Sequence, residues 1–318
     1  MDDQNPKIAF GPIPSRRLGQ SLGINNIPNK ICTYSCVYCQ VGLTNQMVNQ
    51  RAVFYSPKTV VEDVTQHAHT VLSKGKSIDY LSFVPDGEPT LDINLGVEID
   101  QLKPQHIPIA IITNASLIHD SDVRRDLRKA DWVSIKIDAA MPKIWKKVNR
   151  PQKTIDFKNM LKAMPMFSDE YKGVLTTETM LVKDLNDSME HINSLIEVIH
   201  EVNPKTCYLS APIRPPAIQG ILPSTEQTFA IAFDMFKDAG LSVELNTSYG
   251  SGAFDGQDDI KESLLRILAV HPMNKSEIQQ FLHDGNHDWA VIEELQQDQK
   301  ILAVEYQNKT YYVRKHTR

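Results

Sequence analysis

Along most of the chain, short apolar runs alternate with longer segments in which apolar residues recur every three to four positions. The first pattern predicts strands and the second predicts amphipathic helices. We expect strands at 21–27, 79–84, 107–113, 132–138, 173–182, 206–212 and 242–246. We expect helices at 56–75, from about 92, and at 121–130, 143–148, 156–167, 188–202 and 224–240. This alternation predicts right-handed βαβ units on a parallel sheet. Three prolines and three glycines in 10–30 predict an irregular entry to the first strand.

The pattern changes after a glycine-rich stretch, Gly250–Gly256, which is the best linker candidate. Beyond it we expect three helices and two strands, at 260–270, 274–282, 287–297, 300–306 and 310–314. Three helices followed by a hairpin resemble a winged helix-turn-helix. The sequence therefore predicts an α/β domain, a linker and a small winged-helix-like domain, at 1–249, 250–257 and 258–318.

The predicted strand 132–138 carries its polar side chains on one face. Side chains alternate along a strand, so Ser134, Lys136 and Asp138 share a face. Helices cover the outer face of such a sheet, so we expect this polar face to point inward. Glu178 takes an equivalent inward position on the next strand. Buried charges are costly unless they line a polar site, which indicates a binding site inside the sheet. An internal Lys136–Asp138 pair that only fills space is the alternative.

Composition narrows the class of protein without naming a substrate. The chain has 318 residues, of which 41% are hydrophobic and 23% charged, as in an ordinary soluble protein. A net charge of −5 gives no overall case for binding nucleic acid. No apolar run approaches the roughly 20 residues that span a bilayer, and the first ten residues lack a signal-peptide core. We therefore expect a cytoplasmic protein.

Three of the four cysteines, Cys32, Cys36 and Cys39, stand close together, and Cys207 is far away in the sequence. Three thiolates at this spacing can bind one face of a [4Fe–4S] cluster and leave its fourth iron open to another ligand. A disulfide framework suits small secreted domains, and a structural zinc site needs four ligands, with no histidine at ligand spacing nearby. Buried free cysteines are the remaining alternative, but the three are too closely spaced for it.

The cysteine spacing is that of the radical S-adenosylmethionine (SAM) enzymes. The segment Gly11–Gly19, the motif Asp86–Pro89 and the later Arg214–Pro216 resemble, in that order, the branch that contains the tRNA wyosine-forming enzymes. The resemblance covers roughly residues 8 to 246. It implies a partial (β/α)6 TIM-like barrel, a [4Fe–4S] cluster on the three cysteines, and SAM on the open iron. It also implies reductive cleavage of SAM, a radical that takes hydrogen from a substrate, and an external flavodoxin- or ferredoxin-like electron donor.

The resemblance also implies roles for individual residues. Asp86–Pro89 matches the family's Gly-Gly-Glu-Pro motif except at Asp86, whose extra carboxylate we expect to point away from SAM. Gly87 and Glu88 then contact the SAM amino group, and the backbone of Tyr38 faces its adenine. The remaining expected SAM contacts are Asn114 for the ribose and Ser134 and Lys136 for the carboxylate and ribose. Ordinary Asp-Gly and Asn turns are the alternative readings.

Three residues are candidates for contacts to the substrate. Asp138 and Glu178 carry inward carboxylates, and Arg214 lies in a proline-rich loop after the last long strand, where it suits a carboxylate or phosphate. Surface solvation or a SAM contact is the alternative for each. The wyosine-forming enzymes carry a second cluster on further cysteines near the N-terminus, and residues 1–31 contain none. That departure puts the wyosine reaction in doubt.

The charge of the predicted C-terminal domain bears on its partner. Residues 258–318 contain eight Lys or Arg against ten Asp or Glu, and the third helix is acidic. Such a surface repels phosphates. We expect this domain to dock a peptide or protein, or to pack on its own barrel, in preference to binding nucleic acid. A radical SAM enzyme acting on a peptide or protein is slightly favoured, and a tRNA-modifying enzyme or a cluster-bearing regulatory protein are the alternatives.

Overall fold

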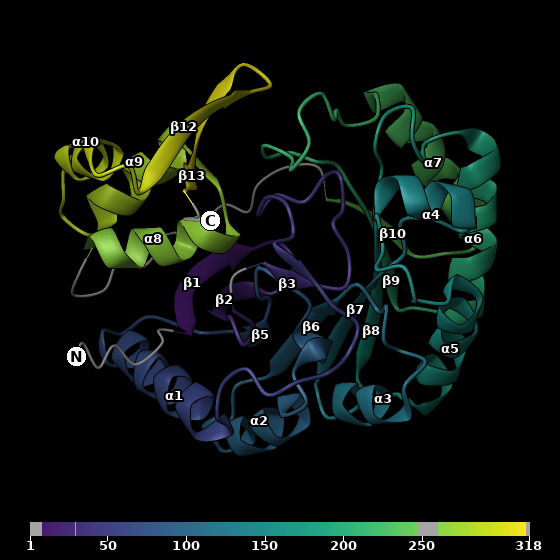
Figure 1. Ribbon diagram of the computed structural model, residues 1–318, viewed down its shortest axis with the longest axis horizontal. Helices are drawn as coiled ribbons and strands as arrows, with labels where there is room; N and C mark the ends of the chain where they lie inside the picture. Colours follow the sequence, from purple (N-terminus) through teal and green to yellow (C-terminus); the bar gives the residue numbers. More distant parts are fainter. Residues whose placement is uncertain (1–7, 29, 247–259, 316–318) are drawn as a thin grey trace.

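The computed structural model describes residues 8–28, 30–246 and 260–315, which Figure 1 draws in colour. Within these ranges, an eight-stranded sheet has the order β1-β2-β5-β6-β7-β8-β9-β10. Its strands are Ala9–Ser15, Gly19–Ile24, Tyr80–Phe83, Ile109–Thr113, Trp132–Lys136, Val174–Met180, Thr206–Ser210 and Val243–Asn246. Strand β1 is antiparallel to β2, and the other neighbours run parallel. The predicted α/β class with a mostly parallel sheet is therefore confirmed.

Helices cover the outer side of the curved sheet (Figure 1). They are α1 (Pro57–Ser73), α2 (Leu95–Leu102), α3 (Ser121–Leu127), α4 (Pro142–Val148), α5 (Phe157–Glu170), α6 (Met189–Val202) and α7 (Glu226–Asp238). Apolar side chains of the helices and strands form one large buried core between them. Helix α7 begins at Glu226 after its N-cap Thr225, two residues later than the expected start at 224. The Ser224 hydroxyl instead donates to Asp187 Oδ2 at 2.8 Å, which takes it away from the helix end.

Strand β1 corrects the expectation of an irregular entry. Seven residues of this stretch form a strand that pairs with β2, with a register shift between Phe10 and Ile13. Its prolines, Pro12 and Pro14, signalled irregular chain because proline cannot donate to a sheet. An edge strand tolerates them, since only one of its sides is paired within this sheet.

The C-terminal domain contains α8 (Ile260–Val270), α9 (Lys275–Asp284), α10 (Ala290–Gln297) and a sheet of β11 (Met273–Asn274), β13 (Lys309–Arg314) and β12 (Ile301–Tyr306). It packs on the β1 edge of the barrel, where Phe10 and Ile13 join the same buried apolar cluster as Leu264 and Ile267 (Figure 1). Packing on its own barrel was one of the arrangements that the sequence left open. The predicted linker, 250–257, lies outside the described residues.

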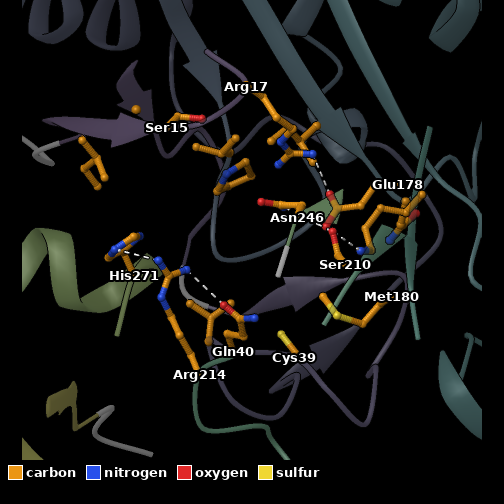
Figure 2. A pocket seen from close by; sticks show the side chains of 18 of the residues that line it. Ser15, Arg17, Cys39, Gln40, Glu178, Met180, Ser210, Arg214, Asn246 and His271 are labelled. Atoms are coloured by element: carbon orange, nitrogen blue, oxygen red, sulfur yellow. Dashed lines mark hydrogen bonds and ion pairs between the residues drawn. The ribbon is translucent and has the colours of Figure 1, made fainter. Parts of the chain in front are cut away.

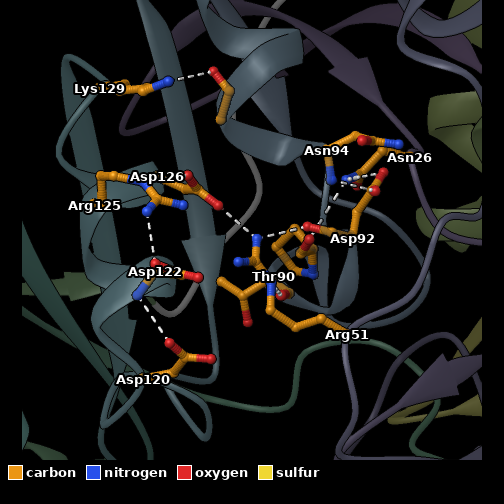
Figure 3. Close-up of polar contacts among 12 residues, drawn as sticks. Asn26, Arg51, Thr90, Asp92, Asn94, Asp120, Asp122, Arg125, Asp126 and Lys129 are labelled. Carbon is orange, nitrogen blue, oxygen red and sulfur yellow. Dashed lines mark hydrogen bonds and ion pairs between the residues drawn. The ribbon is translucent and has the colours of Figure 1, made fainter.

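A buried polar network holds the chain segment that follows the cysteine loop (Figure 3). The Arg51 guanidinium donates to the carbonyl oxygens of Thr90 at 3.0 Å and Asp92 at 2.8 Å, and to Asp126 Oδ2 at 2.5 Å. Thr90 belongs to the 3-10 turn Pro89–Leu91 after β5, and Asp126 belongs to α3. Arg51 therefore fixes the exit of the loop against two neighbouring βα units.

Asp92, whose carbonyl oxygen belongs to this network, lies beside a second buried carboxyl group, that of Glu98. Burial raises the pKa of Glu98 to about 9, and the neighbouring Asp92 charge adds to the shift. Burial also raises the pKa of Asp92, to about 6. Two buried carboxyl groups in contact share a proton, because ionising both of them is energetically costly.

No described helix is long and apolar enough to cross a membrane.

Candidate active site

A cavity of about 420 Å³ lies at the carboxyl ends of the parallel strands. In parallel α/β barrels, functional residues collect at this end. The cavity brings together most of the predicted site residues: Cys32, Cys36, Cys39, Tyr38, Gly87, Glu88, Asn114, Lys136, Glu178 and Arg214. Ser134 and Asp138 do not line it. Cys32 and Arg214, 182 positions apart in the sequence, therefore share one site.

Cys32 ends the short strand β3 (Ile31–Cys32), and Cys36 and Cys39 lie on the loop between β3 and its paired strand β4 (Gln46–Met47). Backbone hydrogen bonds attach this loop to the C-terminal end of α4. Ser35 N–H donates to Asn149 O at 3.1 Å, and Val37 N–H donates to Val148 O at 2.9 Å. The loop is thereby held along its length, although it has little regular structure of its own.

Each of the three cysteine sulfurs has a side-chain N–H donor from a different part of the chain. Asn114 Nδ2 lies 3.6 Å from Cys32 Sγ, and Asn149 Nδ2 lies 3.5 Å from Cys36 Sγ. Lys30 Nζ lies 3.5 Å from Cys39 Sγ. Hydrogen bonds to a sulfur favour its thiolate form, which is the form that binds iron.

The donor set fits an iron–sulfur cluster better than a single metal ion. Burial raises the pKa of the Cys36 thiol to about 12, and the Asp138 charge adds to this shift. Burial also raises the pKa of the Cys32 thiol, and there the Glu88 charge adds to the shift. Such thiols need the positive charge of a bound metal centre in order to ionise. No three His, Cys, Asp or Glu side chains of the described residues converge as they would around one ion. In a [4Fe–4S] cluster, by contrast, each thiolate binds a different iron.

Glu88 ties the end of β5 to the end of β6. Its Oε1 accepts from the hydroxyls of Thr90 and Thr113, both at 2.6 Å, and its Oε2 accepts from Asn114 N–H at 2.8 Å. Burial raises the pKa of Glu88, and these hydrogen bonds oppose the rise. A Cβ on Gly87 would lie 2.0 Å from Ile31 O, so only glycine allows this close approach to the cysteine loop.

A charged group occupies the inner wall of the cavity (Figure 2). Glu178 Oε2 lies 2.8 Å from Arg17 Nη1, and Glu178 Oε1 lies 3.5 Å from Lys136 Nζ. Burial alone raises the pKa of Glu178, but Lys136 and Arg17 outweigh it and bring the pKa to about 2. Glu178 is therefore ionised, and its negative charge holds two cations inside the barrel. Lys136 Nζ also lies 5.1 Å from the ring centre of Tyr38 in the cysteine loop.

Ser134 lies on the same face of β7 as Lys136, and Asp138 lies two residues beyond the end of β7. Neither side chain lines the cavity. The Asp138 carboxylate accepts from the Tyr38 hydroxyl, from Asn149 Nδ2 at 2.7 Å and from Met180 N–H at 2.8 Å. It therefore connects the cysteine loop to β8. Ser134 is fully buried, and its hydroxyl has no hydrogen-bond partner among the described residues.

The C-terminal domain supplies part of the wall opposite the charged group. Arg214 Nη2 lies 2.8 Å from His271 Nε2, and Arg214 Nη1 lies 3.1 Å from Gln40 Oε1 of the cysteine loop (Figure 2). The Tyr306 and Tyr311 hydroxyls donate to Pro212 O at 2.7 Å and to Ile213 O at 2.9 Å, which holds the Arg214 loop. Burial and the Arg214 guanidinium keep the pKa of His271 well below its usual range.

Two of these residues were not found from the sequence. Arg17 belongs to the segment Gly11–Gly19, and its partner Glu178 stands 161 positions away in the sequence. His271 lies beyond the predicted linker, and no local motif signals that it returns to the barrel. The three charged residues of the inner wall share no sequence pattern that predicts their pairing, so the fold alone identifies it.

Comparisons with known proteins agree with this geometry. A family model described as the radical SAM superfamily matches residues 26–196. A UPF0026 protein of Methanocaldococcus jannaschii is 41% identical over 309 residues, which are 96% of each chain. Among solved structures, TYW1 with a lysine-pyruvate adduct bound has a TM-score of 0.53 at 16% identity and covers 69% of this chain and 73% of its own. A radical SAM methyltransferase from Sphaerobacter thermophilus has a TM-score of 0.54 at 13% identity, covering 72% and 67%.

Proposed function

This chain belongs to the radical SAM superfamily, and we propose that it binds one [4Fe–4S] cluster through Cys32, Cys36 and Cys39 and uses SAM to abstract hydrogen from a substrate. Members of the superfamily bind a [4Fe–4S] cluster and SAM. The observation that carries the proposal is that three cysteine sulfurs, each with its own N–H donor, face one cavity. When bound and reduced, the cluster supplies the electron that cleaves SAM.

Residues around the cysteine loop would bind and orient SAM. Gly87 lets the chain approach closely, and Glu88 and the Asn114 side chain line the same part of the cavity. Lys136 is the cation of β7 that lines the cavity, and its charge suits the SAM carboxylate. Tyr38 lies between two of the cysteines and is held by Asp138, so we assign Asp138 a positioning role.

Residues on the far walls would hold the substrate. Glu178 is an ionised hydrogen-bond acceptor on one wall, and Arg214 with His271 forms the other. Because the C-terminal domain contributes His271 to the cavity, we propose that it caps the barrel and shapes the substrate site. A peptide or protein substrate, a tRNA substrate and a regulatory role stay predictions from the sequence. The inward charges favour an enzyme, since a sensor needs no polar barrel interior.

An external one-electron donor of the flavodoxin or ferredoxin kind would dock beside the cysteine loop. Residues 142–154 contain no acidic residue, and their exposed cations are Lys143, Lys146, Lys147, Arg150 and Lys153. This stretch includes the backbone that bonds to the cysteine loop. A positive surface attracts an acidic donor and raises its association rate at low salt.

Anaerobic reconstitution tests the proposed function directly. The purified protein is loaded with iron and sulfide, reduced with dithionite and supplied with SAM, and 5′-deoxyadenosine is measured. We expect an EPR signal of a reduced [4Fe–4S] cluster and slow SAM cleavage even without substrate. A protein that loads no cluster, or a loaded protein that never yields 5′-deoxyadenosine under any substrate screen, contradicts the proposal.

Docking of the donor is tested by charge reversal. The variant Lys146→Glu/Lys147→Glu should slow cluster reduction by a reduced flavodoxin about tenfold at low salt, because several attractive pairs are lost. Reduction by dithionite should not change. The matched control is Lys172→Glu/Lys205→Glu, which reverses two exposed cations at the amino ends of β8 and β9. Equal rates in both variants would place the donor elsewhere.

A further inference from the structure

A buried lysine stands immediately before the cysteine loop. Lys30 is only 2% exposed, and its Nζ donates to Cys39 Sγ at 3.5 Å. Its carbonyl oxygen accepts from the N–H groups of Asn45 and Gln46 at 3.0 and 3.2 Å, so the returning side of the loop holds the lysine backbone. Burying an ammonium group is costly unless nearby groups compensate its charge. We therefore expect a group near Lys30 that interacts with its charge.

A second buried charged residue near Lys30 is Asp86, the residue that departs from the family motif. Asp86 is also 2% exposed, and it does not line the cavity although Pro85, Gly87 and Glu88 do. The turn that carries it packs on the start of the loop, because Glu88 N–H donates to Ile31 O at 3.3 Å. Burial raises the pKa of Asp86, and the charge of Lys30 opposes this rise. Asp86 therefore lies near Lys30 and outside the cavity.

The three sulfur donors are not equivalent. Asn114 and Asn149 present neutral amides to Cys32 and Cys36, whereas Lys30 presents a charged ammonium to Cys39. Net charge, hydrogen bonds to the sulfurs and solvent exposure set the reduction potential of an iron–sulfur cluster. A buried cation stabilises the extra negative charge of the reduced state, because the charge is poorly screened inside the protein.

We infer that Lys30 and Asp86, two buried groups of opposite charge, together set the reduction potential of the cluster on Cys32, Cys36 and Cys39. Lys30 raises the potential through its charge and its bond to Cys39 Sγ, and the nearby Asp86 offsets part of that charge. Both are positioning residues, since neither lines the cavity. The inference rests on the proposed function, because it needs the cluster to bind.

Redox titration of the reconstituted cluster, followed by EPR, tests this pair through opposite shifts. Lys30→Met keeps the length of the side chain and removes its charge, so its midpoint potential should shift downward. Asp86→Asn removes the offsetting charge, so its midpoint should shift upward. Lys30→Arg should stay near the wild-type value. The matched control is Lys129→Met, which removes a lysine bonded to Gly96 O at the amino ends of the strands and should leave the potential unchanged.

The outcomes separate this inference from the proposed function. If the wild type loads no cluster, the proposed function fails. If Lys30→Met loads a full cluster with an unshifted midpoint, or Asp86→Asn shifts downward, Lys30 and Asp86 do not set the potential. If Lys30→Met loads no cluster, the upward shift of Asp86→Asn and the retained value of Lys30→Arg decide the question. SAM affinity, measured by equilibrium binding, should stay within about twofold in every loaded variant.

Discussion

The two ends of the cavity are built in different ways. The cysteine end comes from one short stretch, with Cys32 at the end of β3 and Cys36 and Cys39 on the following loop, which backbone bonds hold to the C-terminal end of α4. The opposite end is assembled from distant parts, because Arg214 follows β9 and His271 belongs to the C-terminal domain. The cysteine motif that the family shares is thus encoded in one short stretch, whereas the end that we propose holds the substrate depends on how two domains pack.

The largest expected effect falls on the cysteine end. Replacing Cys32, Cys36 or Cys39 by Ala should abolish cluster binding, because three ligands already leave one iron without a thiolate. Iron and sulfide content after anaerobic reconstitution measures this. Cys207→Ala is the control, since Cys207 is buried in the main core and does not line the cavity. Loss of iron in that variant would reveal a fourth ligand and contradict the open-site argument.

SAM affinity, measured in variants of Lys136 and of Arg214, compares the two ends of the cavity. Lys136→Met should weaken SAM binding by about ten- to a hundredfold, because a charge-assisted hydrogen bond contributes about 1.5–3 kcal/mol. Arg214→Met should leave SAM affinity within about twofold and keep substrate-free SAM cleavage. Equilibrium binding of SAM to the reconstituted variants checks both values. Equal losses in the two variants would mean that SAM reaches across the whole cavity.

The tyrosine contacts test how firmly the second domain holds the far end. Tyr306→Phe/Tyr311→Phe removes the two hydrogen bonds to the Arg214 loop and should destabilise the protein by about 1–3 kcal/mol, at about 0.5–1.5 kcal/mol for each bond. Thermal unfolding measures the loss. The control is Tyr312→Phe, because Tyr312 follows Tyr311 on β13 and has no hydrogen bond to the barrel among the described residues. Cluster content should be unchanged, and a loss of iron here would show that the two ends are coupled.

The smallest effect concerns the proton held beneath the cysteine end. The pKa of Glu98 is about 9 in the folded protein and 4.5 ordinarily, so the folded state binds more protons between these pH values. The free energy of unfolding contributed by this group therefore falls as the pH rises through that window. Glu98→Gln should raise the free energy of unfolding at pH 8 by on the order of 1 kcal/mol and have little effect near pH 5. The melting temperature at each pH measures the change. The exposed Glu62→Gln is the control, and an equal gain at both pH values contradicts the shared proton.

How much of this site follows from the sequence depends on the range of the interactions. The cysteine spacing and the turn at Gly87 and Glu88 are local, and both reach the cavity as expected. Period-two alternation placed Ser134, Lys136 and Asp138 on one face, but alternation does not tell which position along a strand meets a cavity. Only Lys136 does, since Ser134 is buried and Asp138 bonds to Tyr38.

Longer-range features were beyond sequence reasoning. The prolines of β1 indicated irregular chain, because their tolerance at a sheet edge becomes visible only once the neighbouring strands are known. His271 enters the site through domain packing, which no motif near it records. The net charge of residues 258–318 favoured a protein or peptide partner, or the barrel itself, over nucleic acid. It could not predict that this domain packs against β1.

The shared core at β1 has a consequence for how this protein is made. Phe10 and Ile13 are synthesised about 250 residues before Leu264 and Ile267, with which they pack. At about 5–20 residues per second, these side chains wait many seconds for their partners. During that time the barrel edge exposes an apolar strip that chaperones or another nascent chain can bind. The domain from residue 260 on therefore completes the surface of the barrel, and we expect a chain interrupted before residue 260 to leave the β1 edge uncovered and prone to aggregation.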